Sequence, residues 1–213
     1  MAGPPAASRD VAAAASEYDA FLDAVASGRV APAGGSVIGF AAAGGAALAE
    51  MAVTHTLDHH AGAREDHPAL SDAIRAFQGQ RQVLLALAAA DARVIDRLFG
   101  DGALSNRERA FQQATAIPLS IAEACAAVLS RAAAVASDLA PTVRMDLVSG
   151  ATILGSAALA ALETARVNRD ALGAGVAAET MTARIEALEP TIAADLARLE
   201  TALGLAVPQP TRA

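Results

Sequence analysis

The sequence predicts an all-α protein, an antiparallel up-and-down bundle, and its composition, periodicity and helix-breaking residues each support this. Alanine supplies much of the 54% hydrophobic share, and alanine is the best helix former. Aromatic residues make up only 3%, and no β-branched stretch alternates with the period of a strand. Prolines and glycines divide the chain into six expected helical segments, 10–28, 36–60, 68–99, 105–138, 142–170 and 175–204.

The first three segments are bounded by residues that start or stop helices. The first stops at Gly28, and its apolar side chains recur at helical spacing, namely Tyr18, Phe21, Leu22 and Val25. The second follows the turn-forming pair Gly34 and Gly35. The third runs from Pro68, a residue favoured at a helix start, to Gly100.

Prolines also shape the last three segments. Pro118 lies inside the fourth and should kink or divide it, because proline has no N–H to donate to the preceding turn. The fifth follows Pro141, and the sixth contains Pro190 and ends at Gly204. The connections are short, so neighbouring helices are expected to run antiparallel.

The length and the ends suggest one domain. A chain of 213 residues can bury a substantial core, so we expect residues 1–213 to form a single helical domain. The stretches 1–9 and 207–213 are expected to fray.

Charge and residue usage exclude several functions. The net charge is −7 and no basic patch is present, so nucleic acid is not an expected partner. All 16 basic residues are arginine. The lack of lysine excludes Schiff-base chemistry and a Walker-A phosphate site. The single Cys125 excludes an internal disulfide, and its apolar surroundings predict a packed core thiol.

We expect a soluble, cytoplasmic protein with no membrane partner. Residues 1–9 lack the basic and apolar regions of a signal peptide. The run 30–49 is long enough to raise the question of a membrane span, but it is mostly alanine and glycine. We interpret this run as a buried bundle helix that its neighbours approach closely.

The chemistry of the segment Ala31-Pro32-Ala33-Gly34-Gly35-Ser36 predicts a ligand site there. Its glycines let the backbone turn, and its serine opens the charge-free run 37–49. A helix start offers unpaired N–H groups and a partial positive charge. A glycine-lined start can therefore hold an anion or a carbonyl.

Asp91 is the first candidate for acid–base chemistry. It falls on the apolar face of its helix, at spacings of three and four from Leu84, Ala88, Ile95 and Leu98. A buried carboxylate is costly unless it is paired, and burial raises its pKa. Asp91 is therefore either a catalytic acid or base, or the partner of Arg107 or Arg109 in a salt bridge.

Further polar residues interrupt apolar stripes on two other helices. Glu50 shares a stripe with Ser36 and is either a general base or a carboxylate at the rim of the helix. Asp146, Thr164 and Asn168 lie on one stripe of the fifth segment.

These candidates sort to opposite ends of the bundle. At about 1.5 Å per residue, Asp146 and Asn168 are roughly 33 Å apart along one helix. Alternating helix directions place one set at one end, namely Ser36, Asp91, Arg107, Arg109, Thr164 and Asn168. The other end holds Glu50, Thr54, His55 and Asp146. A site that uses both sets needs an antiparallel contact between two subunits.

No metal site is expected. His55 and His59 are four residues apart and could bind a metal together with Asp58, but no third strong ligand is evident. A solvated helix end is the favoured interpretation.

The chain resembles the cyclodeaminase and cyclohydrolase family, which includes formiminotetrahydrofolate cyclodeaminase and methenyltetrahydrofolate cyclohydrolase. The resemblance covers about 21–170 and is strongest in Pro32-Ala33-Gly34-Gly35-Ser36-Val37 and Gly45-Ala46-Ala47-Leu48-Ala49-Glu50-Met51. Asp91-Ala92-Arg93, 114–119, Arg144-Met145-Asp146-Leu147 and Asn168 also match family segments. The sequence departs from the family pattern at Ala33, Met145 and Thr164, in a short 100–106 and in having no lysine.

The resemblance implies a helical bundle that assembles at least as a dimer and acts on a one-carbon unit carried by tetrahydrofolate. The reaction is either cyclising deamination of the formimino form or hydrolysis of the methenyl form. Both need a positioned carboxylate, for which Asp91 and Asp146 match the family and Glu50 is a further candidate. The candidate ligand-binding residues are Gly34, Gly35, Ser36, Thr164, Asn168 and Arg109.

Two alternatives remain beside a folate enzyme. The departures are compatible with a diverged enzyme that cyclises, deaminates or hydrates another nitrogenous metabolite. They are also compatible with a non-catalytic dimeric scaffold, although the retained Gly34-Gly35-Ser36, Asp91, Asp146 and Asn168 argue against it.

Overall fold

The computed structural model describes residues 6–59, 66–99 and 107–209 and confirms the all-α prediction. Its long helices are α1 (Ala6–Ala26), α2 (Gly34–His59), α3 (Pro68–Phe99), α4 (Arg107–Val135), α5 (Arg144–Asp170) and α6 (Val176–Leu203). Two short 3-10 turns, η2 (Ala136–Asp138) and η3 (Pro141–Val143), join α4 to α5. The expected segment limits are close to these bounds because proline and glycine mark most of them.

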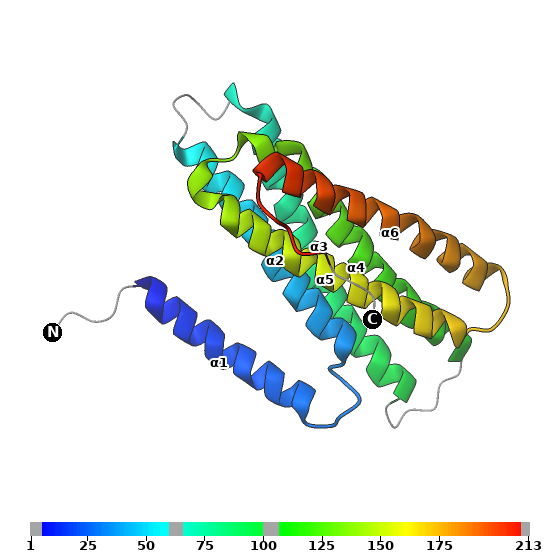
Figure 1. The fold of residues 1–213 in the computed structure, drawn as a ribbon. Helices are drawn as coiled ribbons and strands as arrows, with labels where there is room; N and C mark the ends of the chain where they lie inside the picture. Colours follow the sequence, from blue (N-terminus) through cyan, green and yellow to red (C-terminus); the bar gives the residue numbers. More distant parts are fainter. Residues whose placement is uncertain (1–5, 60–65, 100–106, 210–213) are drawn as a thin grey trace.

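The helices α2 to α5 form the bundle that positions the candidate residues. The helix α2 packs against α3 and α5, and α4 packs against α3, α5 and α6 (Figure 1). The helices α2 and α5 come closest at Gly45 and Gly150, where a Cβ on either residue would lie within 3 Å of the other's carbonyl oxygen. Small residues at this crossing therefore let two helices of the bundle approach backbone to backbone.

The connection between α4 and α5 is tied to α2 by Thr56. Its hydroxyl donates to the Ala52 carbonyl oxygen at 2.9 Å and accepts from the Ala140 N–H at 3.1 Å. Both groups are therefore paired at a buried helix junction, as buried polar groups require.

The fraying expected for 1–9 and 207–213 stays a prediction, and a few residues of these stretches are described. The helix α1 begins at Ala6, inside the stretch 1–9, because the alanine-rich sequence favours helix. Val207, in the stretch 207–213, is buried and joins the hydrophobic core. An apolar side chain just beyond the end of α6 can cover the core and hold the backbone there.

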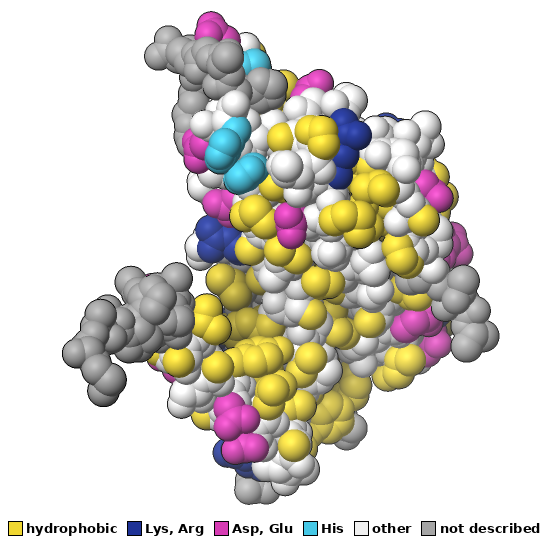
Figure 2. All heavy atoms as spheres, turned by 60° about the vertical axis from the view of Figure 1, so that its left-hand side comes forward, with side chains coloured by type: hydrophobic (Ala, Val, Ile, Leu, Met, Phe, Trp, Pro, Cys, Tyr) yellow, Lys and Arg dark blue, Asp and Glu magenta, His cyan; other side chains and the backbone are white. Residues whose placement is uncertain are grey.

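The helix α1 stands apart from the bundle (Figure 1). In the described part of the chain its ring contact with the body is between Phe21 and Phe40, whose centroids are 4.8 Å apart. Figure 2 shows hydrophobic side chains over a broad part of the face from which α1 projects.

Three helical stretches are long and apolar enough, by length and composition, to cross a membrane, namely Gly34–His59, Arg109–Asp138 and Pro141–Asp170. They belong to the bundle, and 44%, 61% and 56% of their apolar windows are buried inside it. Packing against neighbouring helices accounts for part of this apolar character, and the absence of a membrane partner stays a prediction.

Candidate functional site

The start of α2 and the C-terminal half of α3 meet at Asp91. A Cβ on Gly35 would lie 2.3 Å from Asp91 Oδ1, so the absence of a side chain at position 35 makes room for the carboxyl group. Asp91 is 4% exposed and Ser36 is 1% exposed. The glycine turn therefore accommodates a carboxyl group of the protein itself, in a site closed to bulk water.

Ser36 lies between two oxygen atoms of α3. Its Oγ is 3.1 Å from Asp91 Oδ2 and 3.0 Å from the Ala88 carbonyl oxygen. A hydroxyl group carries one proton and donates to one acceptor at a time. When Asp91 is protonated, it donates to Ser36 Oγ and leaves the serine proton for the Ala88 carbonyl. Both contacts are then hydrogen bonds at once, so the geometry suits a neutral Asp91.

Burial raises the pKa of Asp91 above its ordinary value, because desolvation disfavours the ionised carboxylate. Hydrogen bonds from the side chain and the backbone N–H of Ser36 act in the opposite direction and offset part of this rise in pKa. A carboxyl group with a raised pKa can both give and take a proton closer to neutral pH, as a general acid or base requires.

The predicted alternative, a salt bridge from Asp91 to Arg109, is not formed in the described part of the chain. The side chain of Arg107 lies outside the described residues. Arg109 itself is exposed near the start of α4.

The helix α2 begins at Gly34, two residues before the expected serine start. The backbone N–H groups of Ser36 and Val37 donate to the Ala33 carbonyl oxygen at 3.1 and 3.4 Å. The serine side chain therefore reaches across to α3 instead of capping its own helix. The carboxyl group of Asp91 occupies the place at this helix start where a ligand was expected.

Asn168 has a structural partner in α4. Its Nδ2 donates to the Ala114 carbonyl oxygen at 2.7 Å. Pro118 follows Ala114 by four residues and has no N–H, so that carbonyl would lack its partner within the helix. Asn168 thereby satisfies the acceptor that the proline leaves open. The Oδ1 atom of the same amide can accept a hydrogen bond from another donor. Thr164 donates to the Ala160 carbonyl oxygen of its own helix at 2.9 Å.

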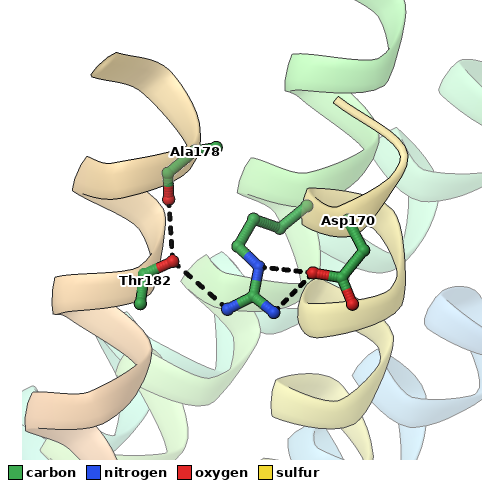
Figure 3. A network of polar contacts seen from close by, with 4 residues as sticks. Asp170, Ala178 and Thr182 are labelled. Carbon is green, nitrogen blue, oxygen red and sulfur yellow. Dashed lines mark hydrogen bonds and ion pairs between the residues drawn. The ribbon is translucent and has the colours of Figure 1, made fainter. Parts of the chain in front are cut away.

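The neighbouring Arg169 ties the end of α5 to α6. Its Nη1 donates to Thr182 Oγ1 at 3.2 Å, and Thr182 donates in turn to the Ala178 carbonyl oxygen at 2.9 Å. Its Nε donates to Asp170 at 2.9 Å (Figure 3). This network fixes the end of the helix that carries Thr164 and Asn168.

Glu50 lies toward the opposite end of the bundle from Asp91, where the expected alternation of helix directions places it. Its Oε1 accepts from Gln78 at 2.9 Å, and its Oε2 accepts from Arg81 at 3.1 Å. An open pocket of about 470 Å³ beside this ion pair is lined by Glu50, Thr54, His55, Asp58 and Arg81, with Ala47 and Met51. No local pattern in the sequence pointed to Gln78 or Arg81 as partners of Glu50, because they come from another helix.

Asp146 is half-buried in the first turn of α5, where the helix dipole favours a negative charge. The helices α2 and α5 run antiparallel, with Gly45 against Gly150. Asp146 therefore lies toward the C-terminal end of α2, with Glu50 and away from Asp91. Within one subunit the structure brings together Ser36 and Asp91, and it keeps Asp146 apart from them.

The histidines of this end stack on each other. The rings of His55 and His59 are 4.1 Å apart, and His59 Nδ1 lies 2.8 Å from the His55 carbonyl oxygen. Over the described ranges, no three metal-binding side chains come together.

Comparisons with known proteins agree with this architecture. A family model described as formiminotransferase-cyclodeaminase matches residues 17–187. Among solved structures, formiminotetrahydrofolate cyclodeaminase from Thermotoga maritima is similar with a TM-score of 0.79 and 19% identity, over 86% of this chain and 93% of that chain. At this identity the likeness shows the fold. No curated protein sequence matches.

Proposed function

Because the chain belongs to the formiminotransferase-cyclodeaminase family, we propose that it is an enzyme acting on a one-carbon unit carried by tetrahydrofolate. The observation that carries this proposal is Asp91, a buried carboxyl group held by Ser36 at a glycine-lined helix start. Such a group, with its raised pKa, is suited to proton transfer in a site sheltered from water.

The proposed reaction is cyclising deamination. N10 of the substrate attacks the carbon of the protonated formimino group on N5, forming the N10–C bond. Asp91 takes the proton from N10 and gives it to the departing nitrogen, so that the C–N bond breaks and ammonia leaves. The product bridge carries a positive charge, which a nearby carboxylate stabilises.

Hydrolysis of the methenyl form is the same chemistry with water as the attacking group. Here Asp91 accepts the proton of the water that adds to the bridge carbon, and the carbon–nitrogen bond then opens. Asp91 returns this proton to the nitrogen that leaves the carbon, and the hydroxyl proton of the adduct is released to water as the C=O bond of the formyl group forms. A carboxyl group that exchanges one proton serves either direction.

We further propose that the enzyme works as a homodimer. Asp146 and Glu50 lie at the other end of the bundle from Asp91, so they cannot act on the same atom within one subunit. An antiparallel contact between two copies brings the Asp146 end of one to the Asp91 end of the other. Thr164, the Oδ1 atom of Asn168 and Arg109 lie on the Asp91 side, where they are candidates to bind substrate.

A second candidate function is supported by the departures from the family pattern. Ala33, Met145 and Thr164 replace polar or turn-forming residues of that pattern, and lysine is absent. These changes favour an enzyme of the same fold that cyclises, deaminates or hydrates another nitrogenous metabolite. The buried Asp91–Ser36 pair argues against a purely structural scaffold, because an apolar pair would cost less to bury.

The test is direct incubation with formimino- and methenyl-tetrahydrofolate, followed by the absorbance of the methenyl bridge. We expect turnover that Asp91→Asn reduces by at least 100-fold. Asp96→Asn is the matched control, because Asp96 is an exposed aspartate on the same helix. If the wild-type protein neither turns over nor binds either folate, a folate reaction is excluded and the second candidate function remains.

A further inference from the structure

The helix α1 carries an apolar stripe that its own subunit leaves in water. Val11, Tyr18 and Leu22 lie at offsets of 7 and 4 residues, on one face of the helix, and all three are exposed, Val11 by 69%. Over the described residues, its ring contact with the body is Phe21 on Phe40. An isolated amphipathic helix is marginal in water, so this stripe requires a surface to cover it.

A surface of matching chemistry lies on α2 and α5. Met51, Met145 and Ile153 are exposed there, Met145 by 58%. Between Val37 and Ala49, α2 has no charged residue, and its exposed positions include Ala41 and Gly44. Hydrophobic side chains cover a broad part of this face in Figure 2. An uncharged face of small residues and methionines lets another helix approach closely, and it suits a contact with its own copy.

The helix α1 is acidic, and the surface beside Met145 holds the acidic Asp146 together with one guanidinium nitrogen that has no partner among the described residues. The helix α1 carries four acidic residues, Asp10, Glu17, Asp19 and Asp23, against the single Arg9, a net charge of −3. Beside Met145, the Nε of Arg144 is buried and has no hydrogen-bond partner in the described part of the chain. An acidic helix laid over Met145 would bring carboxylates to that guanidinium.

The direction of α1 decides which copy can cover Met145. Phe21 near the end of α1 contacts Phe40 near the start of α2, so the C-terminal end of α1, with Leu22, lies at the Ser36 end of its own subunit, and α1 runs from there along α2 (Figure 1). Met145 lies at the opposite end, because α5 runs antiparallel to α2. In an antiparallel pair of subunits, the Leu22 end of α1 in one copy reaches the Met145 end of the other.

We propose that α1 is an exchanged arm: each copy lays the Val11–Tyr18–Leu22 stripe over Met51 and Met145 of a second copy. This arm exchange rests on the homodimer proposed above and defines which elements make the contact. It also closes the open side of α2 with a helix from the partner.

Cross-linking between two distinguishable copies tests the exchange. One tagged copy carries Leu22→Cys and a second, differently tagged copy carries Met145→Cys, and the mixture is refolded together and treated with a short bismaleimide. The only native cysteine, Cys125, is fully buried and does not compete. We expect a covalent pair that carries both tags. The matched pair Ala20→Cys with Met145→Cys should link much less, because Ala20 lies on the opposite face of α1.

The oligomeric state tests the same proposal without a cross-linker. Leu22→Asp should weaken dimerisation at least tenfold in analytical ultracentrifugation, whereas Ala20→Asp adds the same charge to the other face and should leave it unchanged. Circular dichroism checks that both variants remain helical. A monomeric wild-type protein, an unchanged dimer in Leu22→Asp, or the absence of a covalent pair that carries both tags would each overturn the exchange. None of these measurements uses folate, so their failure is separate from a failure of the proposed reaction.

Discussion

At the scale of single residues, the ionisation of Asp91 links the site to stability. Its folded-state pKa is raised above the ordinary value of 3.8, so the folded protein holds this proton more tightly than the unfolded chain does. The free energy of unfolding should therefore fall as pH rises from 3.8 through the raised pKa, and level off above it. Asp91→Asn removes this contribution and should gain stability relative to wild type over that window.

Urea unfolding between pH 4 and 8 measures this difference. Asp96→Asn, at an exposed position, is expected to run parallel to wild type across the range. A constant offset between Asp91→Asn and wild type at every pH would show that Asp91 ionises as it does in the unfolded chain.

Two adjacent glycines provide a second residue-scale prediction. A methyl group on Gly35 would lie 2.3 Å from Asp91 Oδ1, whereas a methyl group on Gly34 meets nothing within 4 Å. Gly35→Ala must push the buried carboxyl group away from Ser36, and overpacking of this kind costs about 1–3 kcal/mol. Gly34→Ala should be neutral or stabilising by up to about 1 kcal/mol, because alanine favours helix. Chemical denaturation of both variants decides the point, and equal stabilities would contradict the close packing.

At the scale of helices, the link between α4 and α5 rests on an amide that pairs with the carbonyl group left open by Pro118. Asn168→Ala removes the hydrogen bond to the Ala114 carbonyl and should cost about 1–3 kcal/mol, since that acceptor is left without a partner. In a Pro118→Ala background the helix regains its own N–H donor, so Asn168→Ala should cost less there.

A double-mutant cycle by urea unfolding measures this coupling. Thr164→Ala serves as the control, because its hydroxyl bonds within its own helix and should not couple to Pro118. Additive effects of Asn168→Ala and Pro118→Ala would mean that the amide does not replace the missing N–H.

The helices were predictable because their limits are set by local chemistry. Proline and glycine stop helices wherever they fall, so the segments could be placed from the sequence to within a few residues. The inward position of Asp91 followed from spacings of three and four. Its partner Ser36 and the pairing of Glu50 with Arg81 arise between helices, where sequence spacing carries no information. Local sequence patterns also could not predict that α1 stands apart from the bundle, because its apolar stripe resembles that of a packed helix.

At the scale of the whole molecule, the candidate carboxylates divide between two ends. Asp91, on α3, lies against the start of α2, and Asp146 lies with Glu50 toward the other end of α2. One subunit alone cannot bring Asp91 and Asp146 to one substrate atom, but the antiparallel dimer proposed above would form two sites, each with Asp91 from one copy and Asp146 from the other.

This arrangement predicts complementation between inactive variants. Asp91→Asn and Asp146→Asn homodimers should each lack activity, because every site has lost one carboxylate. When equal amounts are refolded together, half of the dimers contain one copy of each variant, and in these one of the two sites keeps both carboxylates. The mixture should regain about a quarter of wild-type activity on the substrate that the wild-type protein turns over. If each site were built within one subunit, every site would still lack a carboxylate and the mixture would stay inactive.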